Sequence, residues 1–244
     1  MFAKFFTFFV FMVFSVSSIG AEIKMVDSQG GRISKHVMSL SGEIEEGDAE
    51  DFVAFLFNQP KDRLPIRTLM IGKSPGGNLD VAMDIGRVVR DLNIRVLVYD
   101  DCYSACAIIA LSAVSRMYVG DIGLHRPYYN RDFYSDLSTK DARKWYSEME
   151  GKVKFYLRDN GVSENVISKM FSVSSTDMLT FSPGEAERYL GTYHPYFEEL
   201  AISNCSKRTK NPDPYIGVDS ECLERFIMER QMNSFMEMYE MYWG

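Results

Sequence analysis

The sequence predicts an α/β fold built on a parallel-rich sheet, and two patterns lead to this prediction. Three short runs, at residues 67–71, 94–98 and 116–120, have the length and apolar content of strands. Helix-like segments lie between them: residues 79–92 carry apolar side chains on one face, and residues 105–111 are small and apolar throughout. Strands that alternate with helices of this length form βαβ units, whose neighbouring strands are parallel.

The segment before residue 67 extends the same pattern. Residues 22–32 are expected to form a polar strand or a lead-in to one. Residues 36–44 alternate polar and apolar side chains, as a half-buried strand does. A helix is expected over residues 49–58, and Pro60 ends it.

Beyond Pro127 the sequence becomes helical. Helices are expected over residues 139–160, 163–171 and 183–190, and a last helix follows a loop at residues 204–218. Their predicted N-caps are Ser138, Ser163, Ser182 and Ser220. We therefore expect the chain to have three parts: a signal peptide (1–21), an α/β domain (22–200), and a C-terminal loop and helix held by a disulfide (201–244).

The first 21 residues have the features of a secretory signal peptide. Lys4 supplies a positive charge, residues 5–16 are almost wholly apolar, and residues 17–21 are small enough for a cleavage site. The apolar run is shorter than the roughly 20 residues that span a bilayer. The sequence therefore predicts a periplasmic or secreted protein. The alternative is a protein anchored by an uncleaved N-terminal segment.

Charge and cysteine spacing exclude two classes of function. The net charge of −7 argues against a nucleic-acid partner, and the basic run at residues 207–210 is interpreted as a solvated turn. The cysteines form no CxxC pair and no histidine cluster accompanies them, which argues against a metal site. We expect no cofactor.

Export would place the four cysteines in an oxidising compartment, where three pairings are open to them. Cys205 and Cys222 flank a proline-bearing loop, and closing such a loop is a common use of a disulfide. We therefore predict this pair. Cys102 and Cys106 stand four residues apart and could pair across one helical turn.

Ser104 lies where the strand at residues 94–98 gives way to the helix at residues 105–111. One interpretation is a helix N-cap, a position that serine favours. The other is an acyl-transfer nucleophile, with the free N–H groups of the helix end beside it. A Ser-Pro-Gly-Gly turn at residues 74–77 and His125 also follow strand ends, where ligands bind in parallel sheets. This convergence favours the nucleophile.

Three motifs carry a resemblance to a known family. KSPGG at residues 73–77, CYSACA at 102–107 and GLHRP at 123–127 follow one another with helix-sized gaps. In this order they resemble the Clp protease proteolytic subunit and its relatives in the crotonase-like superfold, most closely exported relatives that contain cysteines. The resemblance covers residues 67–191. It implies a repeated ββα sheet, parallel-rich, with a helical C-terminal part.

The resemblance also implies roles for individual residues. Ser104 would be the nucleophile and His125 the general base, while the N–H groups of Gly77 and Ala105 would form the oxyanion hole. Asp177 would orient the histidine, although it matches the family pattern only with a one-residue insertion. Two further departures are Lys73, where the family has Asn, and Cys102, where the family has a small residue before the serine.

The implied function is a serine endopeptidase that hydrolyses peptide bonds without its own ATPase. A peptide or an unfolded protein would be its substrate, and we expect a homo-oligomer or a membrane-protein partner. A Ser-Lys dyad with Lys144 or Lys152 is one alternative, although both lysines lie in a polar helix. The other is an inactive binding or assembly module, with a disulfide between Cys102 and Cys106 restricting access to Ser104.

Overall fold

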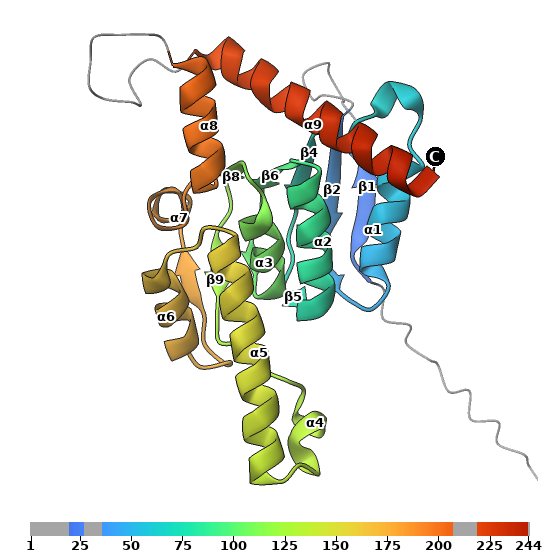
Figure 1. Ribbon diagram of the computed structural model, residues 1–244. Coiled ribbons are helices and arrows are strands. Elements are labelled where there is room, and N and C mark those ends of the chain that lie inside the picture. Colours follow the sequence, from blue (N-terminus) through green and yellow to red (C-terminus); the bar gives the residue numbers. More distant parts are fainter. Residues whose placement is uncertain (1–19, 27–35, 207–218, 244) are drawn as a thin grey trace, which may run out of the picture.

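The structure is a computed structural model that describes residues 20–26, 36–206 and 219–243 (Figure 1). Most of the expected signal peptide and the basic run at residues 207–210 lie outside these residues. None of the helices within the described ranges is long and apolar enough to cross a membrane.

A five-stranded sheet forms the centre of the fold, and four of its strands are parallel. The strands lie in the order β1 (Glu22–Met25), β2 (Val37–Ser41), β4 (Thr68–Ile71), β6 (Arg95–Val98) and β8 (Arg116–Tyr118). Only β1 is antiparallel to its neighbour. The predicted parallel-rich sheet is confirmed, and β4, β6 and β8 are adjacent as expected.

Each parallel strand is followed by a very short strand and then a helix, which makes the fold a repeat of ββα units. The short strands are β3 (Glu43–Ile44), β5 (Gly76–Gly77), β7 (Cys102–Tyr103) and β9 (Ile122–Leu124). The helices after the first three are α1 (Asp48–Phe57), α2 (Leu79–Asp91) and α3 (Ala105–Ser112). β3 pairs with β5, β7 pairs with β9, and β10 (Leu179–Phe181) is antiparallel to β9.

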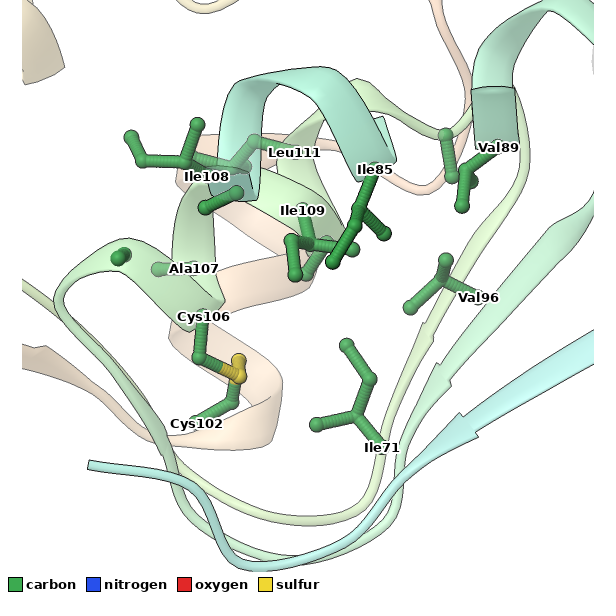
Figure 2. Packing of buried hydrophobic residues seen from close by; sticks show 14 of the residues in the cluster. Ile71, Ile85, Val89, Val96, Cys102, Cys106, Ala107, Ile108, Ile109 and Leu111 are labelled. Atoms are coloured by element: carbon green, nitrogen blue, oxygen red, sulfur yellow. A yellow bond between two sulfur atoms is a disulfide. The ribbon is translucent and has the colours of Figure 1, made fainter. Parts of the chain in front are cut away.

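Helix α3 is the buried centre of the molecule, because all eight of its residues are buried. It packs against α2 and against the face of the main sheet. Figure 2 shows Ile109 of α3 close to Ile85 of α2, with Val96 and Ile71 of the sheet opposite. A helix that is apolar on every side is stable only inside a core. This packing fixes the start of α3, where Ser104 lies.

The remaining helices surround the sheet. They are α4 (Arg131–Ser135), α5 (Thr139–Asp159), α6 (Glu164–Ser172), α7 (Pro183–Leu190), α8 (Pro195–Cys205) and α9 (Ser220–Trp243), with a 3-10 turn η1 (Lys61–Arg63) after α1. In Figure 1, α5 extends below the sheet beside α4, and α9 crosses the opposite end. Ser138 and Ser163 cap α5 and α6 as predicted.

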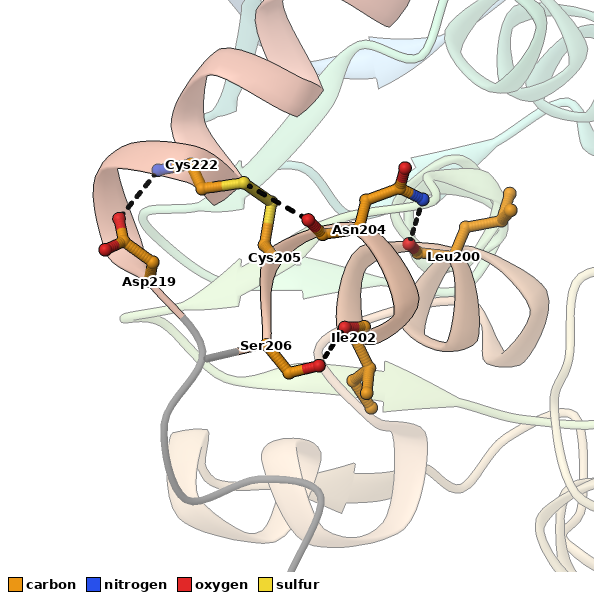
Figure 3. The surroundings of a disulfide bond; sticks show 7 residues. All are labelled: Leu200, Ile202, Asn204, Cys205, Ser206, Asp219 and Cys222. Atoms are coloured by element: carbon orange, nitrogen blue, oxygen red, sulfur yellow. Dashed lines mark hydrogen bonds between the residues drawn. A yellow bond between two sulfur atoms is a disulfide. The ribbon is translucent and has the colours of Figure 1, made fainter. Parts of the chain in front are cut away.

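The start of α9 corrects one prediction. The Asp219 carboxylate, and not the hydroxyl of Ser220, accepts a hydrogen bond from the Cys222 N–H, at 2.9 Å (Figure 3). Ser220 is instead the first residue of the helix. An aspartate at the N-cap satisfies the same free N–H groups and its charge favours the helix N-terminus.

A disulfide and several side-chain hydrogen bonds attach helix α9 to the rest of the fold. The predicted Cys205–Cys222 disulfide is present and joins the end of α8 to the first turn of α9 (Figure 3). Further along, the buried Gln231 side chain donates hydrogen bonds to the carbonyls of Arg67 and Asn93, both at 2.9 Å. The C-terminal helix therefore lies against the end of the main sheet where β4 and β6 begin.

Candidate active site

Ser104 lies in a strained turn between β7 and α3. Its backbone angles, φ 57° and ψ −123°, are unusual for a residue with a side chain and cost about 1–3 kcal/mol. Two bonds hold the turn: the Ser104 N–H donates to the Gly123 carbonyl (2.9 Å), and the Ser104 carbonyl accepts from Ala107 (3.0 Å). A strained residue that its surroundings fix in place is characteristic of functional sites.

The side chain of Ser104 faces a histidine and does not cap the helix. Its Oγ lies 2.7 Å from Nε2 of His125. It accepts no hydrogen bond from the first turn of α3. The N-cap interpretation therefore describes the position of Ser104 along the chain, but not the use of its hydroxyl.

His125 directly follows β9 and is buried, with 8% of its surface exposed. Its other ring nitrogen, Nδ1, lies 2.9 Å from the backbone carbonyl of Arg126. A carbonyl oxygen only accepts hydrogen bonds, so in the neutral ring Nδ1 carries the proton. The lone pair of Nε2 then faces Ser104, and the serine hydroxyl donates to it.

Asp177 lies in the turn before β10, where its carboxylate is exposed. Its N–H donates to the Ser174 carbonyl at 3.1 Å. Within the described residues, no hydrogen bond joins Asp177 to His125. The Arg126 carbonyl occupies the position next to Nδ1 that the sequence assigned to a carboxylate. Every residue has a backbone carbonyl, so no sequence pattern could have identified this one as the partner of His125.

The Ser-Pro-Gly-Gly turn lies directly against the Ser104 turn. Gly76 has φ +99°, and a Cβ added to it would come within 2.7 Å of Ser104 Cβ and 2.8 Å of the Ala105 nitrogen. Only glycine permits this approach. Ala105 is the first residue of α3, so its N–H has no acceptor within the helix. The absence of a side chain at position 76 leaves that N–H uncovered.

Gly77 has φ +136°, and an added Cβ would lie 2.1 Å from the Ile44 carbonyl oxygen. That carbonyl accepts its hydrogen bond from the next residue, Asn78, at 2.7 Å. Gly77 lines the same cleft as Ser104 and Ala105. The two residues that the resemblance assigned to the oxyanion hole are thus brought to one site.

Ser74 holds the Ser-Pro-Gly-Gly turn against the Ser104 turn, and the Cys102–Cys106 disulfide closes the Ser104 turn itself. Ser74 is buried, its hydroxyl donates to the Gly42 carbonyl (2.6 Å), and its backbone pairs with Cys102 across a parallel bridge. The disulfide between Cys102 and Cys106 spans Ser104, with both cysteines in the core (Figure 2). The covalent link closes the peptide segment that contains the strained residue.

Ser104 and His125 open onto a cleft of about 1130 Å³. Its walls come from the Ser-Pro-Gly-Gly turn, α2, the segment after His125, and α5. The larger apolar side chains among the lining residues are Leu79, Ile108, Tyr128, Tyr129, Trp145, Met149, Val153 and Met170. An apolar cleft with a few convergent polar groups is the usual form of a ligand site.

The lysines of the alternative dyad are engaged with carboxylates. Lys152 lines the cleft, but its Nζ lies 2.7 Å from Asp80 and its side chain is half exposed. Lys144 is two-thirds exposed and lies 4.0 Å from Glu148. A lysine that acts as a base needs a desolvated environment, and exposed lysines paired with carboxylates lack that setting.

A second histidine, His194, lies away from Ser104 at the start of α8. Its Nε2 is 3.0 Å from the Asp159 carbonyl, and its backbone N–H donates to Val114. Burial lowers its pKa below the ordinary value, and the nearby charges of Arg116 and Arg90 act in the same direction. His194 therefore serves the packing of α8.

No protein-family model matches the sequence, and no curated protein matches it significantly. Its fold is similar to solved structures of proteases. A variant of the 1510-N membrane-bound stomatin-specific protease is 19% identical over 74% of this chain and 90% of that chain, with a TM-score of 0.46. Another variant of that protease, in complex with a substrate peptide, is 18% identical over 74% and 85%, with a TM-score of 0.47. A variant of ClpP1 from Listeria monocytogenes is 18% identical over 65% of this chain and 89% of that chain, with a TM-score of 0.49.

Proposed function

We propose that this protein is an exported serine peptidase in which Ser104 is the nucleophile and His125 the general base. The observation that carries the proposal is the 2.7 Å contact between Ser104 Oγ and His125 Nε2, made from a strained turn that opens onto a cleft. A nucleophile within hydrogen-bond reach of a base, which a third group orients, is the arrangement that activates serine.

In the proposed reaction, Nε2 takes the hydroxyl proton as Oγ bonds to the carbonyl carbon of a peptide. The N–H groups of Gly77 and Ala105 stabilise the negative charge that develops on the carbonyl oxygen. His125 then passes the proton to the leaving amine, and the C–N bond breaks. Water, deprotonated by His125, attacks the acyl-enzyme, releases the acid and restores Ser104.

The Arg126 carbonyl takes the part that we expected of Asp177. Its hydrogen bond with Nδ1 keeps the proton on that nitrogen and holds the ring toward Ser104. The carbonyl is a dipole and not a full charge, so it stabilises the imidazolium ion less than a carboxylate would.

A peptide or an unfolded segment fits the size and apolar lining of the cleft. Both disulfides argue for an oxidising compartment, where we expect the enzyme to act without an ATPase of its own. We still expect the protein to form a homo-oligomer or to act with a membrane-protein partner.

The test uses the full chain, exported and purified with its disulfides intact. A fluorophosphonate probe should label the wild type and the Ser172→Ala control, whose serine is exposed on α6. It should not label Ser104→Ala, and hydrolysis of quenched fluorogenic peptides should follow the same pattern. A folded wild type that neither reacts with the probe nor cleaves any peptide would favour the inactive binding module instead.

A further inference from the structure

Asp48, the first residue of α1, is a buried carboxylate with only 5% of its surface exposed. Its Oδ2 accepts hydrogen bonds from two backbone N–H groups, that of Glu45 (2.7 Å) and that of Ala21 (2.9 Å). In the described part of the chain, no basic side chain forms an ion pair with it. Buried carboxylates are normally paired with a cation, because burying an isolated charge is costly.

The residue before Ala21 also lies against this carboxylate. A Cβ added to Gly20 would fall 2.4 Å from Asp48 Oδ1, so a side chain there would displace the carboxylate from its present position. Gly20 and Ser18 are small residues at the first and third positions before the bond between residues 20 and 21. That is the spacing that a signal peptidase recognises.

We propose that the chain is cleaved between Gly20 and Ala21, and that the new α-ammonium group of Ala21 forms a buried ion pair with Asp48. This boundary lies one residue before the one predicted from the sequence. A signal-peptide-cleaving peptidase would add water across the bond, giving a carboxylate on Gly20 and a protonated amine on Ala21. The nitrogen that now donates one hydrogen bond to Asp48 would then bring the missing positive charge to the same place.

The ion pair lies on a short path to the Ser104 turn. Asp48 also binds the N–H of Glu45, the residue that directly follows β3. β3 pairs with β5, which contains Gly76 and Gly77, and Gly76 packs on Ser104. We therefore expect processing to stabilise the glycine turn of the site, a consequence that rests on the proposed function.

The first experiment locates the cleavage. The full chain is expressed with export, purified without reduction, and its N-terminus is determined by intact mass and N-terminal sequencing. A mature chain that begins at Ala21 is the expected result. A chain that begins at Glu22, or that keeps Gly20, would overturn the proposal, whether or not the protein is a peptidase.

The second experiment tests the ion pair by comparing Asp48→Asn with Glu50→Gln in the processed protein. Both changes remove one negative charge from the first turn of α1, but Glu50 is exposed. Because breaking a buried pair leaves an uncompensated charge, Asp48→Asn should lower Tm by about 6–15 °C. Glu50→Gln should change Tm by less than about 2 °C. Equal shifts in the two variants would count against the pair.

A third measurement needs no variant, so it holds even if Asp48→Asn does not fold. An amine-reactive acylating reagent is applied to the native and to the denatured mature protein, and the modification of Ala21 is followed by peptide mapping. The native α-amine should react at least tenfold more slowly than the denatured one. Equal rates would show that the amine is free in solution and would refute the pairing with Asp48.

Discussion

The backbone carbonyl of Arg126 lies 2.9 Å from Nδ1 of His125, on the side of the ring opposite Ser104. The two residues are adjacent in the chain, so the ring is oriented by its own following peptide unit. Such an arrangement fixes the tautomer without a charged group. The ring of His125 is thus oriented by a group other than the carboxylate that was expected at Asp177.

The first prediction concerns Asp177. Since its exposed carboxylate makes no hydrogen bond with His125 in the described structure, Asp177→Asn should change kcat/KM less than about threefold. In a triad that depends on its aspartate, the same change lowers kcat by about 10⁴. Peptide hydrolysis and fluorophosphonate labelling rates measure the difference. A loss of a hundredfold or more, in a variant with unchanged Tm, would assign the orienting role to Asp177 after all.

The second prediction concerns the coupling of Ser104 and His125. Ser104→Ala and His125→Ala should each lower kcat by about 10⁴-fold or more, and the double variant should be no slower than the single ones. The reason is that the proton transfer needs both groups, so the second loss removes nothing further. Single-turnover rates on one fluorogenic peptide measure it. Multiplicative losses would mean that the two side chains act independently.

Much of the fold could be predicted from the sequence, because long elements repeat a pattern. The strands β4, β6 and β8 and the helices from α1 to α3 were found within one or two residues, while the strand predicted over residues 36–44 is divided into β2 and β3. The short strands β3, β5 and β7 were not foreseen, because two residues are too few to show an alternation. Helix α8 was missed, because no element was assigned to the residues between 191 and 203.

The same distinction, between features that have a sequence pattern and features that do not, applies to the site. Ser104 and His125 were found because their side chains stand in recognisable motifs at strand ends, and the structure brings them within 2.7 Å. The Arg126 carbonyl was not, because any residue provides one. The contact of Asp48 with Ala21 joins positions 27 residues apart, and nothing in the cleavage-site pattern at residues 17–21 indicates Asp48 as a partner. Tertiary contacts of this kind lie outside what a single sequence indicates.

The third prediction compares the two disulfides. Removing Cys102–Cys106 with alanines frees the peptide segment that holds Ser104 in its strained turn, so kcat should fall at least tenfold. The loop it closes is short, so the loss of stability should be about 2 kcal/mol by chain entropy. Replacing Cys205 and Cys222 with alanines opens a longer loop and should cost about 3 kcal/mol while leaving kcat within about twofold.

Urea unfolding and peptide hydrolysis of both double variants test this comparison. Each pair serves as the control for the other, because both remove one covalent link. If the variant without Cys102–Cys106 keeps the wild-type kcat, the disulfide has no part in holding the nucleophile. The core packing around it, seen in Figure 2, would then be sufficient.

The last prediction concerns stability in acid and follows from the surroundings of His194. Its Nε2 donates to the Asp159 carbonyl, while its Nδ1 is buried and has no hydrogen-bond partner among the residues that the structure describes. A proton on Nδ1 would be a buried donor without an acceptor, and it would add a charge near Arg116 and Arg90. Burial is the largest cause that lowers the pKa of His194 from its ordinary value of 6.5.

Because the unfolded chain binds this proton near pH 6.5 and the folded protein only at lower pH, acid favours the unfolded state. The contribution of His194 to stability is therefore complete above about pH 6.5 and decreases as the pH falls toward the lowered pKa of the folded state. Urea unfolding at pH 7.5, 6.5 and 5.5 should show this decrease for the wild type. His194→Gln, which keeps an N–H donor for Asp159 but cannot take up the proton, should lose less stability over the same interval. Parallel curves for the two proteins would place the acid sensitivity in other groups.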